Sequence, residues 1–490
     1  MKKVCNRLLA LLLIGCLVLA GCATETPVEV TTTPTTEPVV TTNPYSLESS
    51  GPFISNISAG FGRVDISPTE PTALHSSGSM SSDIQDPLYA TCIALTDSSD
   101  NTVLLFTLDL INSYSAIMDD ARQLISDETE IPFDAILVSA TQSSSSPDLT
   151  NPDEPSVANY IAQLKSWMVE AAVAALADRA PAKVYITSTA TENLNFVNRY
   201  HLQNGNYAGD NFGNFKDAPI AAHETAADNC LQLICLNRQY KQDILLANYQ
   251  VDPNRDNSTN VTADLIAPFR EKMEATTGCQ FAYFTGASGN VDPSSRIEEE
   301  NVTLNYIEQG QALADYALSA YATFQEVPTT SVKISKTLYA AKVDHSLDGW
   351  KYYAQEAVNY YNAHGEFAHY FQTMQNGGIT SEYLIHTLLT RSQMPKQVEI
   401  PIYAVSLGDV AFVTVPFDMF DTNGMQIKNG SPYSMTFVLT GANNSYGYLP
   451  SEVAFKHGGY SVDVTLFARG TAEDLVSSYL DMLKTLYYGK

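Results

Sequence analysis

The stretch "TVLLFTLDL", residues 102–110, is an apolar run of the length of one buried strand. A segment from about residue 117 to 127 follows it and has apolar positions at helical spacing. The next apolar run, "AILVSA" at residues 135–140, completes a strand–helix–strand unit. Because such a unit is typical of parallel strands covered by helices, the sequence predicts an α/β fold.

Outside this unit, apolar runs and helical patterns continue to the end of the chain. Further strands are predicted at residues 182–190, 243–250 and 280–287, with helices at about 157–176, 263–275 and 350–390. Two apolar runs within residues 398–416 are joined by Gly408-Asp409, which indicates a hairpin. No second low-complexity linker or internal repeat interrupts residues 51–490. We therefore expect one large domain with mixed sheets flanked by helices.

The first 21 residues have the form of a signal peptide. Three basic residues among the first seven precede an apolar run, and small residues precede Cys22. The quartet at residues 19–22 resembles the bacterial lipobox, which implies cleavage before Cys22 and a lipid on its thiol. An uncleaved membrane helix is the alternative, but the run is short for a span and glycines interrupt it. We expect a bacterial lipoprotein, held by lipid at the extracytoplasmic face of the cell membrane.

Residues 22–50 are rich in Thr, Pro and Glu and contain few large apolar side chains, so they predict a tether rather than a folded unit. The whole chain of 490 residues has 54 acidic against 27 basic residues, a formal net charge of −27. Such an acidic surface repels nucleic acid, and we therefore expect no nucleic-acid partner.

Four cysteines lie beyond the N-terminal segment: Cys92, Cys230, Cys235 and Cys279. None of them has CxxC spacing, and a chain of this length does not need disulfides for its stability. We expect buried free thiols rather than disulfides or a zinc–thiolate site.

A polar run follows the strand at residues 135–140: Gln142, then the four serines at residues 143–146, then Pro147-Asp148. In α/β sheets, ligands bind at the carboxyl ends of strands. The run is therefore a candidate site rather than a linker.

Nine segments resemble, in order, segments of the neutral/alkaline ceramidases, whose zinc-dependent catalytic domain hydrolyses the amide bond of N-acylsphingosines. They are "AGFGRVDISP" (59–68), "DPLYATCIAL" (86–95), "LFTLDL" (105–110), "ILVSATQSSSSPD" (136–148), "FVNRY" (196–200), "ANYQVDP" (247–253), "FTGASGNVDP" (284–293), "VPFDMF" (415–420) and "GANNSYGYLPSEVAFKHGGY" (441–460). The resemblance spans nearly the whole domain and implies the fold of the ceramidase catalytic domain.

The resemblance also exposes changes at the zinc position. The family pattern after the strand is similar to Ala-Thr-His-Thr-His-Ser-Gly-Pro-Asp, and here Gln142 and Ser144 occupy the two histidine positions. A carboxamide or a hydroxyl is a much poorer zinc ligand than an imidazole.

The other zinc-ligand positions of the family correspond to Asp252, Asp418 and Tyr448. The family has a histidine at the first position and a glutamate at the second, whereas the tyrosine is kept. The resulting set contains only oxygen ligands, which suits calcium or magnesium better than zinc, if the site holds a metal at all.

Three further residues match catalytic positions of the family. Arg199 resembles the arginine that faces the substrate carbonyl, and Tyr460 resembles the tyrosine that steadies the oxyanion. Asp292 stands where the true ceramidases have a serine. The resemblance thus implies that groups able to stabilise negative charge are kept.

Two main functions remain open. The first is an amide (N-acyl) hydrolase with an altered or lost zinc site. Without zinc, Asp252 or Asp418 would have to act as general base on water, and an aspartate is a weak base for this step unless it is buried. The second is a non-catalytic surface protein that keeps the pocket for a lipid, peptide or glycan. A purely structural envelope protein is a third reading. A bound divalent ion would favour the enzyme.

Overall fold

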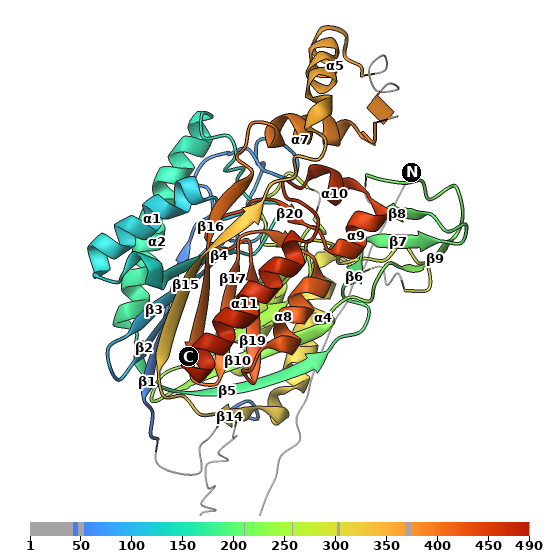
Figure 1. Cartoon of the computed structure of the whole chain (residues 1–490). Coiled ribbons are helices and arrows are strands. Elements are labelled where there is room, and N and C mark those ends of the chain that lie inside the picture. Colours follow the sequence, from blue (N-terminus) through green and yellow to red (C-terminus); the bar gives the residue numbers. More distant parts are fainter. Residues whose placement is uncertain are drawn as a thin grey trace, which may run out of the picture. The chain divides into compact units, whose positions relative to one another are not determined.

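Two β-sheets stack face to face at the centre of the fold (Figure 1). The computed structural model describes residues 43–47, 53–209, 211–256, 258–300, 304–367, 374–375, 377–379 and 381–489. The larger sheet has nine strands in the order β12-β11-β10-β5-β1-β2-β3-β4, with β14 beside β5. The smaller sheet has the order β15-β16-β17-β19. Both belong to one compact unit that starts at Tyr45.

The strands of the larger sheet are β1 (Ile57–Asp65), β2 (Tyr89–Asp97), β3 (Thr102–Leu108), β4 (Ile136–Ala140), β5 (Ala180–Ala190), β10 (Cys230–Arg238), β11 (Ile244–Tyr249), β12 (Gln280–Thr285) and β14 (Gln325–Val327). Those of the smaller sheet are β15 (Val332–Lys342), β16 (Gln397–Leu407), β17 (Val410–Val415) and β19 (Met435–Thr440). Short pairings beside them involve β6 (Phe196–Val197), β13 (Val291–Asp292), β7 (Arg199–Leu202), β8 (Tyr207–Gly209), β9 (Ile220–His223), β18 (Asp418–Met419) and β20 (Tyr448–Leu449).

Helices cover the outer face of each sheet. The α-helices are α1 (Ser115–Thr129), α2 (Pro155–Ala177), α3 (Ile266–Thr277), α4 (Tyr306–Ser319), α5 (Lys351–His364), α7 (Glu382–Arg391), α8 (Asp421–Gly430), α9 (Glu452–His457), α10 (Tyr460–Val464) and α11 (Thr471–Tyr488), and short 3-10 turns lie at Phe133–Ala135, Tyr321–Thr323 and Asp348–Trp350. Helices α1 to α4 pack on the larger sheet, whereas α8 and α11 pack on the smaller one. The result is a four-layer α/β/β/α arrangement.

The alternation of side chains explains why strand β3 is apolar throughout. Leu104 and Phe106 point into the cluster under helices α1 to α4, and Val103 and Leu105 point into the layer between the two sheets. Because both faces of the strand are buried, every position favours an apolar side chain. The predicted α/β fold with mixed sheets flanked by helices is confirmed.

Individual elements follow the sequence pattern closely. Strands β3 and β4 pair in parallel around α1, with Leu105 opposite Leu137, as predicted. The hairpin between β16 and β17 is also confirmed, and Gly408 adopts a φ of +59° there. Helix α3 begins at Ile266, later than predicted, because Asp264 has a left-handed φ of 52°.

Glycine permits a close approach of helix α2 to strand β1. A Cβ atom on Gly62 would lie 2.1 Å from the carbonyl oxygen of Ala171 in α2. The helix backbone therefore rests directly on the strand, which only glycine allows.

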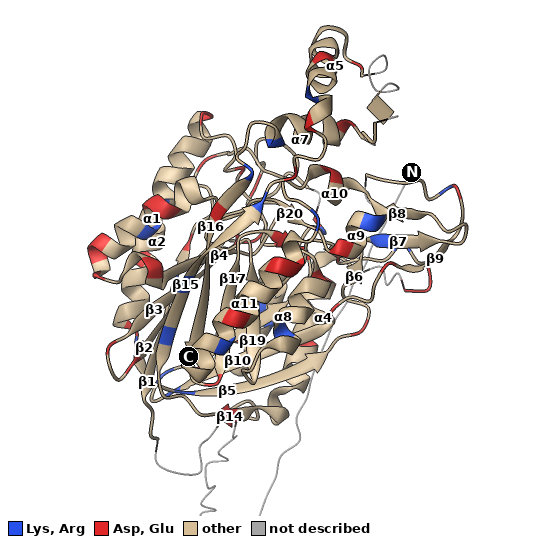
Figure 2. Cartoon of the chain, viewed as in Figure 1, with Lys and Arg blue, Asp and Glu red and all other residues tan. Residues whose placement is uncertain are grey.

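The distribution of charged residues and the state of the cysteines in the structure agree with the expectations from the sequence. Figure 2 shows Asp and Glu on the outer helices α1 and α11, with fewer Lys and Arg. The predicted free thiols are confirmed: Cys92, Cys235 and Cys279 are buried and unpaired, and Cys230 is free and half-buried. Among the described residues, no helix combines the length and apolar character that crossing a membrane requires.

Most of the predicted N-terminal features lie outside the described residues. These include the signal peptide at residues 1–21, Cys22 and the greater part of the tether at residues 22–50. Tyr45, near the end of the predicted tether, packs edge-on against Tyr321 with 5.1 Å between ring centroids. Tyr45 thus belongs to the compact unit of the domain.

Candidate functional site

A cavity of about 390 Å³ lies where β4, β11 and β12 end and β18 pairs with β20. Nearly all of its side chains are polar; Ile111 and Phe212 are the aliphatic and phenyl exceptions. Its lining consists of His75, Ile111, Asn112, Gln142, Asn198, Arg199, Asn211, Phe212, Asp252, Asn254, Ser288, Gly289, Asp292, Asp418, Tyr448, Tyr460 and Ser461. The structure thus brings together every predicted site residue of the domain except Ser144.

Gln142, one of the predicted ligands, lines the cavity and is hydrogen-bonded at both ends of its amide. Its Nε2 donates to Oδ1 of Asp418 at 2.8 Å, and its Oε1 accepts from Oγ of Ser288 at 2.6 Å. The residue has a left-handed φ of 65°, which is unfavourable for a side chain of this kind. This backbone conformation and the two bonds hold the carboxamide against Asp418.

Three of the four serines after Gln142 donate their hydroxyl groups to backbone carbonyls: Ser143, Ser145 and Ser146. Ser143 donates to the carbonyl of Thr262 at 3.1 Å, and Ser146 donates to the carbonyl of Ser143 at 2.8 Å. Ser146 also accepts from the backbone N–H of Ile111 at 3.0 Å, and so it fixes part of the cavity wall. Ser144 does not line the cavity, so it is not brought to the other predicted ligands.

Asp252 and Asp418 come from different layers and meet at the cavity. Asp252 follows β11, and Asp418 opens β18, where it pairs with Tyr448. Burial raises the pKa of Asp418 from 3.8 to about 6. Burial also raises the pKa of Asp252 well above 3.8, and repulsion from Asp292 and Asp418 adds to the effect. Both groups thus meet the condition of burial under which an aspartate can be more than a weak base.

The two tyrosines of the predicted site stand side by side. The rings of Tyr448 and Tyr460 lie 5.9 Å apart at 77°, and Tyr460 also packs edge-on against Tyr383 of α7 at 4.8 Å. Burial raises the pKa of both hydroxyls, and nearby carboxylates, first that of Asp418, raise that of Tyr448 further. Both phenols are therefore neutral hydrogen-bonding groups at physiological pH.

Asp292 lines the same cavity from the short strand β13. Its Oδ1 accepts a hydrogen bond from Nδ2 of Asn198 at 3.1 Å. The carboxyl group is thus held beside Asn198, the residue between strands β6 and β7.

Arg199 lies in the cavity wall but is held mainly by protein. Its Nε and Nη2 donate to the two oxygens of Glu224 at 2.7 and 3.1 Å, and Nη2 also donates to the carbonyl of Gly458 at 2.8 Å. The side chain is 2% exposed, and its Nη1 has no hydrogen-bond partner. Most of the guanidinium is therefore engaged, with one N–H group remaining.

Glu224 is a site residue that the sequence reasoning missed. Its carboxylate binds Arg199 on one side and Nδ1 of His457, at 2.6 Å, on the other. His457 in turn stacks on Tyr207 with ring centroids 3.7 Å apart. Glu224 stands in a polar, loop-like stretch of sequence, and no local pattern marks it as buried.

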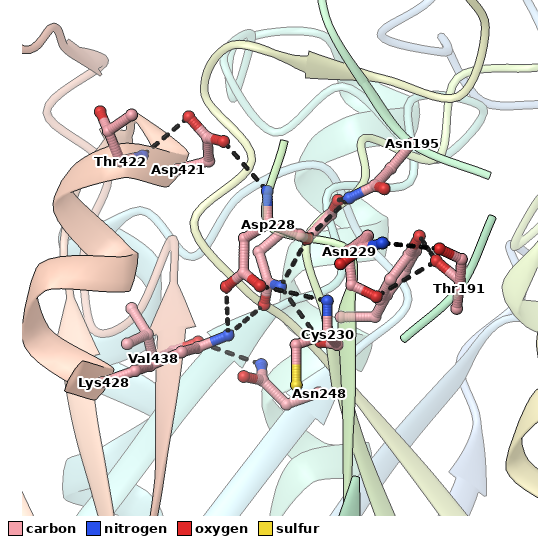
Figure 3. A network of polar contacts seen from close by, with 12 residues as sticks. Thr191, Asn195, Asp228, Asn229, Cys230, Asn248, Asp421, Thr422, Lys428 and Val438 are labelled. Carbon is pink, nitrogen blue, oxygen red and sulfur yellow. Dashed lines mark hydrogen bonds and ion pairs between the residues drawn. The ribbon is translucent and has the colours of Figure 1, made fainter. Parts of the chain in front are cut away.

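A buried polar network joins residues that are close in sequence to two of the cavity carboxyl groups (Figure 3). The ammonium of Lys428 in α8 lies 3.0 Å from Oδ2 of Asp228. The same ammonium lies 2.6 Å from Oε1 of Gln250. The backbone N–H of Asp228 donates to Oδ2 of Asp421 at 3.2 Å. Since Gln250 precedes Asp252 and Asp421 follows Asp418, this network fixes both carboxyl groups of the cavity relative to each other.

The residues present do not fit a zinc ion. Among the described residues, no three His, Cys, Asp or Glu side chains lie close enough to hold one metal ion together. His75 also lines the cavity, but its Nδ1 lies 3.5 Å from Oδ1 of Asp148, and the amide N–H group of Gln142 already occupies an oxygen of Asp418. Binding of calcium or magnesium by these oxygens stays a prediction.

Comparisons with known proteins agree with the fold. No family model matches the sequence, and no curated protein matches it. The chain is similar in structure to the neutral ceramidase of Pseudomonas aeruginosa, with a TM-score of 0.65 and 14% identity over 88% of this chain and 75% of that one. A ceramidase solved in complex with C2 gives a TM-score of 0.65 and 13% identity, over 89% of this chain and 76% of that one. This protein therefore has a neutral-ceramidase-like fold.

Proposed function

We propose that this protein is a surface receptor that binds a small ligand in the polar cavity and does not use zinc to hydrolyse amide bonds. One observation carries the proposal: Gln142 holds Asp418 and Ser288 with the two ends of its amide, at the position where the resemblance implies a zinc-binding histidine. The amide nitrogen that faces Asp418 has no lone pair for a metal, and the amide oxygen, a weaker zinc ligand than an imidazole, already accepts from Ser288.

The shape of the cavity supports binding as the retained activity. It is of the size that small-molecule sites have, and its polar groups converge from several elements. A fold shared with ceramidases does not by itself determine the reaction, because one fold hosts many functions.

A second candidate is a hydrolase that works without a metal. Asp418 has a pKa of about 6, so near neutral pH this carboxyl group can both hold and release a proton. Asp252, with its raised pKa, lies in the same cavity. Such a pair is suited to general acid–base chemistry on water.

The first test separates the receptor from both hydrolases. The full chain in detergent is dialysed against metal-free buffer, its metal content is measured by plasma mass spectrometry, and hydrolysis of N-acyl amides is assayed with and without added zinc. We expect no stoichiometric zinc and no turnover. One zinc per chain together with amide hydrolysis would overturn the proposal. Zinc-independent turnover that Asp418→Asn abolishes would establish the metal-free hydrolase.

We also propose that Cys22 anchors the protein to the bacterial cell membrane at the extracytoplasmic face. The support is the lipobox-like quartet before it and the tether after it. The variant Cys22→Ser is expected to move the protein from the membrane pellet to the soluble fraction after cell fractionation. Cys92→Ser, a substitution inside the domain, is the control and should leave the distribution unchanged. Continued membrane association of Cys22→Ser would refute the anchor.

A further inference from the structure

Two carboxyl groups of the cavity lack a cationic partner. Asp252 accepts from Nδ2 of Asn254 at 3.1 Å, and Asp418 accepts from Gln142. Within the part of the chain that the structure describes, neither forms an ion pair with a lysine, arginine or histidine. The two groups repel each other across the cavity. A ligand with positive charge would therefore find two hydrogen-bond acceptors and a favourable field.

The basic residues of the lining do not supply this charge. Arg199 is neutralised by Glu224, and His75 lies 3.5 Å from Asp148. The charge of the two carboxyl groups is therefore left for a ligand to balance.

The opposite wall points to a different ligand group. Nη1 of Arg199 is buried and has no hydrogen-bond partner. It lies beside Phe212 and the turn before Tyr460, because a Cβ on Gly459 would meet Phe212 at 2.9 Å and Nη1 at 3.0 Å. A buried N–H group without an acceptor is costly, and a ligand hydroxyl or carbonyl oxygen at this wall would satisfy it.

The remaining lining favours hydroxyl groups over alkyl chains. Asn112, Asn198, Asn211 and Asn254 present amides, and the tyrosines present hydroxyls. Only Ile111 and Phe212 offer apolar contact without a polar group, which is too little wall for a long acyl chain.

We propose that the cavity binds a small hydroxylated primary amine, with its ammonium between Asp252 and Asp418 and an oxygen acceptor at Nη1 of Arg199. The inference rests on the proposed receptor function and names the class of its ligand. A compact metal ion matches this site less well than an ammonium-bearing molecule does, since no three acidic, histidine or cysteine side chains of the described residues converge on one point.

Isothermal titration of the full chain with three probes tests the charge and the hydroxyl groups separately. Glucosamine carries both, glucose lacks the ammonium, and octylamine has the ammonium but replaces the hydroxyls with an alkyl chain. We expect glucosamine to bind at least tenfold more tightly than either of the others at pH 7. Equal binding of glucose would overturn the inference while leaving the receptor function intact, and tighter binding of octylamine would overturn the polar character.

Single substitutions test whether the ammonium of the ligand binds at Asp252. Asp252→Asn is expected to weaken glucosamine binding at least tenfold and to change glucose binding by less than threefold. The matched control is Asp315→Asn on the exposed face of α4, which should leave both unchanged. The absence of glucosamine binding to the wild-type chain, or stoichiometric calcium binding that Asp252→Asn abolishes, would also overturn the inference. Neither outcome requires zinc or amide hydrolysis, so the proposed function is judged separately.

Discussion

Buried carboxyl groups occur in two neighbouring regions of this molecule, and the two regions differ in the partners that these groups have. In the buried polar network, Asp228 has the ammonium of Lys428 at 3.0 Å, and Gln250 shares that ammonium. In the cavity, Asp252 and Asp418 receive hydrogen bonds from neutral amides. In the first region Asp228 therefore has a cationic partner, while Asp421 beside it is held by Asn290 and backbone N–H groups; among the described residues, neither Asp252 nor Asp418 in the second region has a cation.

The presence or absence of a cationic partner distinguishes a carboxylate that stabilises the native structure from one that is available to a ligand. A buried carboxylate with an ammonium partner stabilises the native arrangement only as a pair, so its purpose is to fix the chain around it. A carboxyl group without a cation keeps a raised pKa and costs stability near neutral pH, which is typical of sites kept for a ligand or a reaction. The Lys428 ammonium between Asp228 and Gln250 also illustrates the contact that we propose for the ligand.

The largest effect is expected from breaking the completed pair. Lys428→Met leaves Asp228 buried without its cation and should lower the free energy of unfolding by about 3–5 kcal/mol, measured by urea denaturation. Lys241→Met removes a more exposed ion pair with Asp178 and should cost less than about 1 kcal/mol. If Lys428→Met lowered the free energy of unfolding by as little as Lys241→Met does, the network would not stabilise the fold around the cavity.

A change of opposite sign is expected in the cavity. The pKa of Asp418 is raised from 3.8 to about 6, so the folded state binds the proton more tightly than the unfolded state. This contribution to stability is complete below about pH 4 and is lost as the pH rises through about 6. Asp418→Asn mimics the protonated form, and it should raise the free energy of unfolding at pH 8 by about 1–3 kcal/mol.

The same variant should give almost no gain at pH 4, where the wild-type carboxyl is protonated as well. Thermal unfolding at both pH values measures the difference. Asp228→Asn is the matched control and should destabilise at pH 8, because it leaves Lys428 without its partner. A destabilised Asp418→Asn at pH 8 would contradict the comparison.

Gln142, which is hydrogen-bonded to Asp418 and Ser288 in the cavity, gives a third test. The double variant Gln142→His, Asp252→His places an imidazole at each of the two positions. It removes the amide that is bound to Asp418 and supplies two nitrogen ligands. With Asp418 and Tyr448 these make a set that suits zinc. We expect about one zinc per chain after dialysis, against none for the wild type, and a zinc-dependent rise in the melting temperature. Failure of a folded double variant to bind zinc would show that the position has lost more than its ligands.

The smallest effects are expected within the serine run. Ser146→Ala removes a buried hydroxyl that both accepts from Ile111 and donates to Ser143, and it should cost about 1–2 kcal/mol. Ser144→Ala should change the free energy of unfolding by less than about 0.5 kcal/mol, because this half-buried side chain supports neither contact. Urea denaturation of both variants measures the contrast, and equal costs would contradict the assignment.

The sequence predicted which residues form the site, but it did not predict the hydrogen bonds between them. The resemblance located Gln142, Asp252, Asp418 and Tyr448, and all four line one cavity. It could not show that Gln142 donates to Asp418, since residues 276 positions apart meet only through the packing of the two sheets. Glu224 escaped for a similar reason: its burial depends on Arg199 and His457, which come from distant segments.

Ser144 shows the limit of reading a motif position by position. Gln142 and Ser144 both occupy histidine positions of the family pattern, yet only Gln142 reaches the cavity. The left-handed backbone at Gln142 and the hydrogen bonds of the neighbouring serines set which side chains point inward.

By itself, the sequence determined the α/β fold, because apolar periodicity is a local property that follows from which faces of each strand and helix are buried. It also determined the acidic composition and, through the resemblance, the absence of histidine from the positions that correspond to zinc ligands in the ceramidases. Only the tertiary structure decided which carboxyl groups are balanced and which are left open. That choice depends on distances between residues far apart in the chain, and burial in a medium of low dielectric makes those distances decisive.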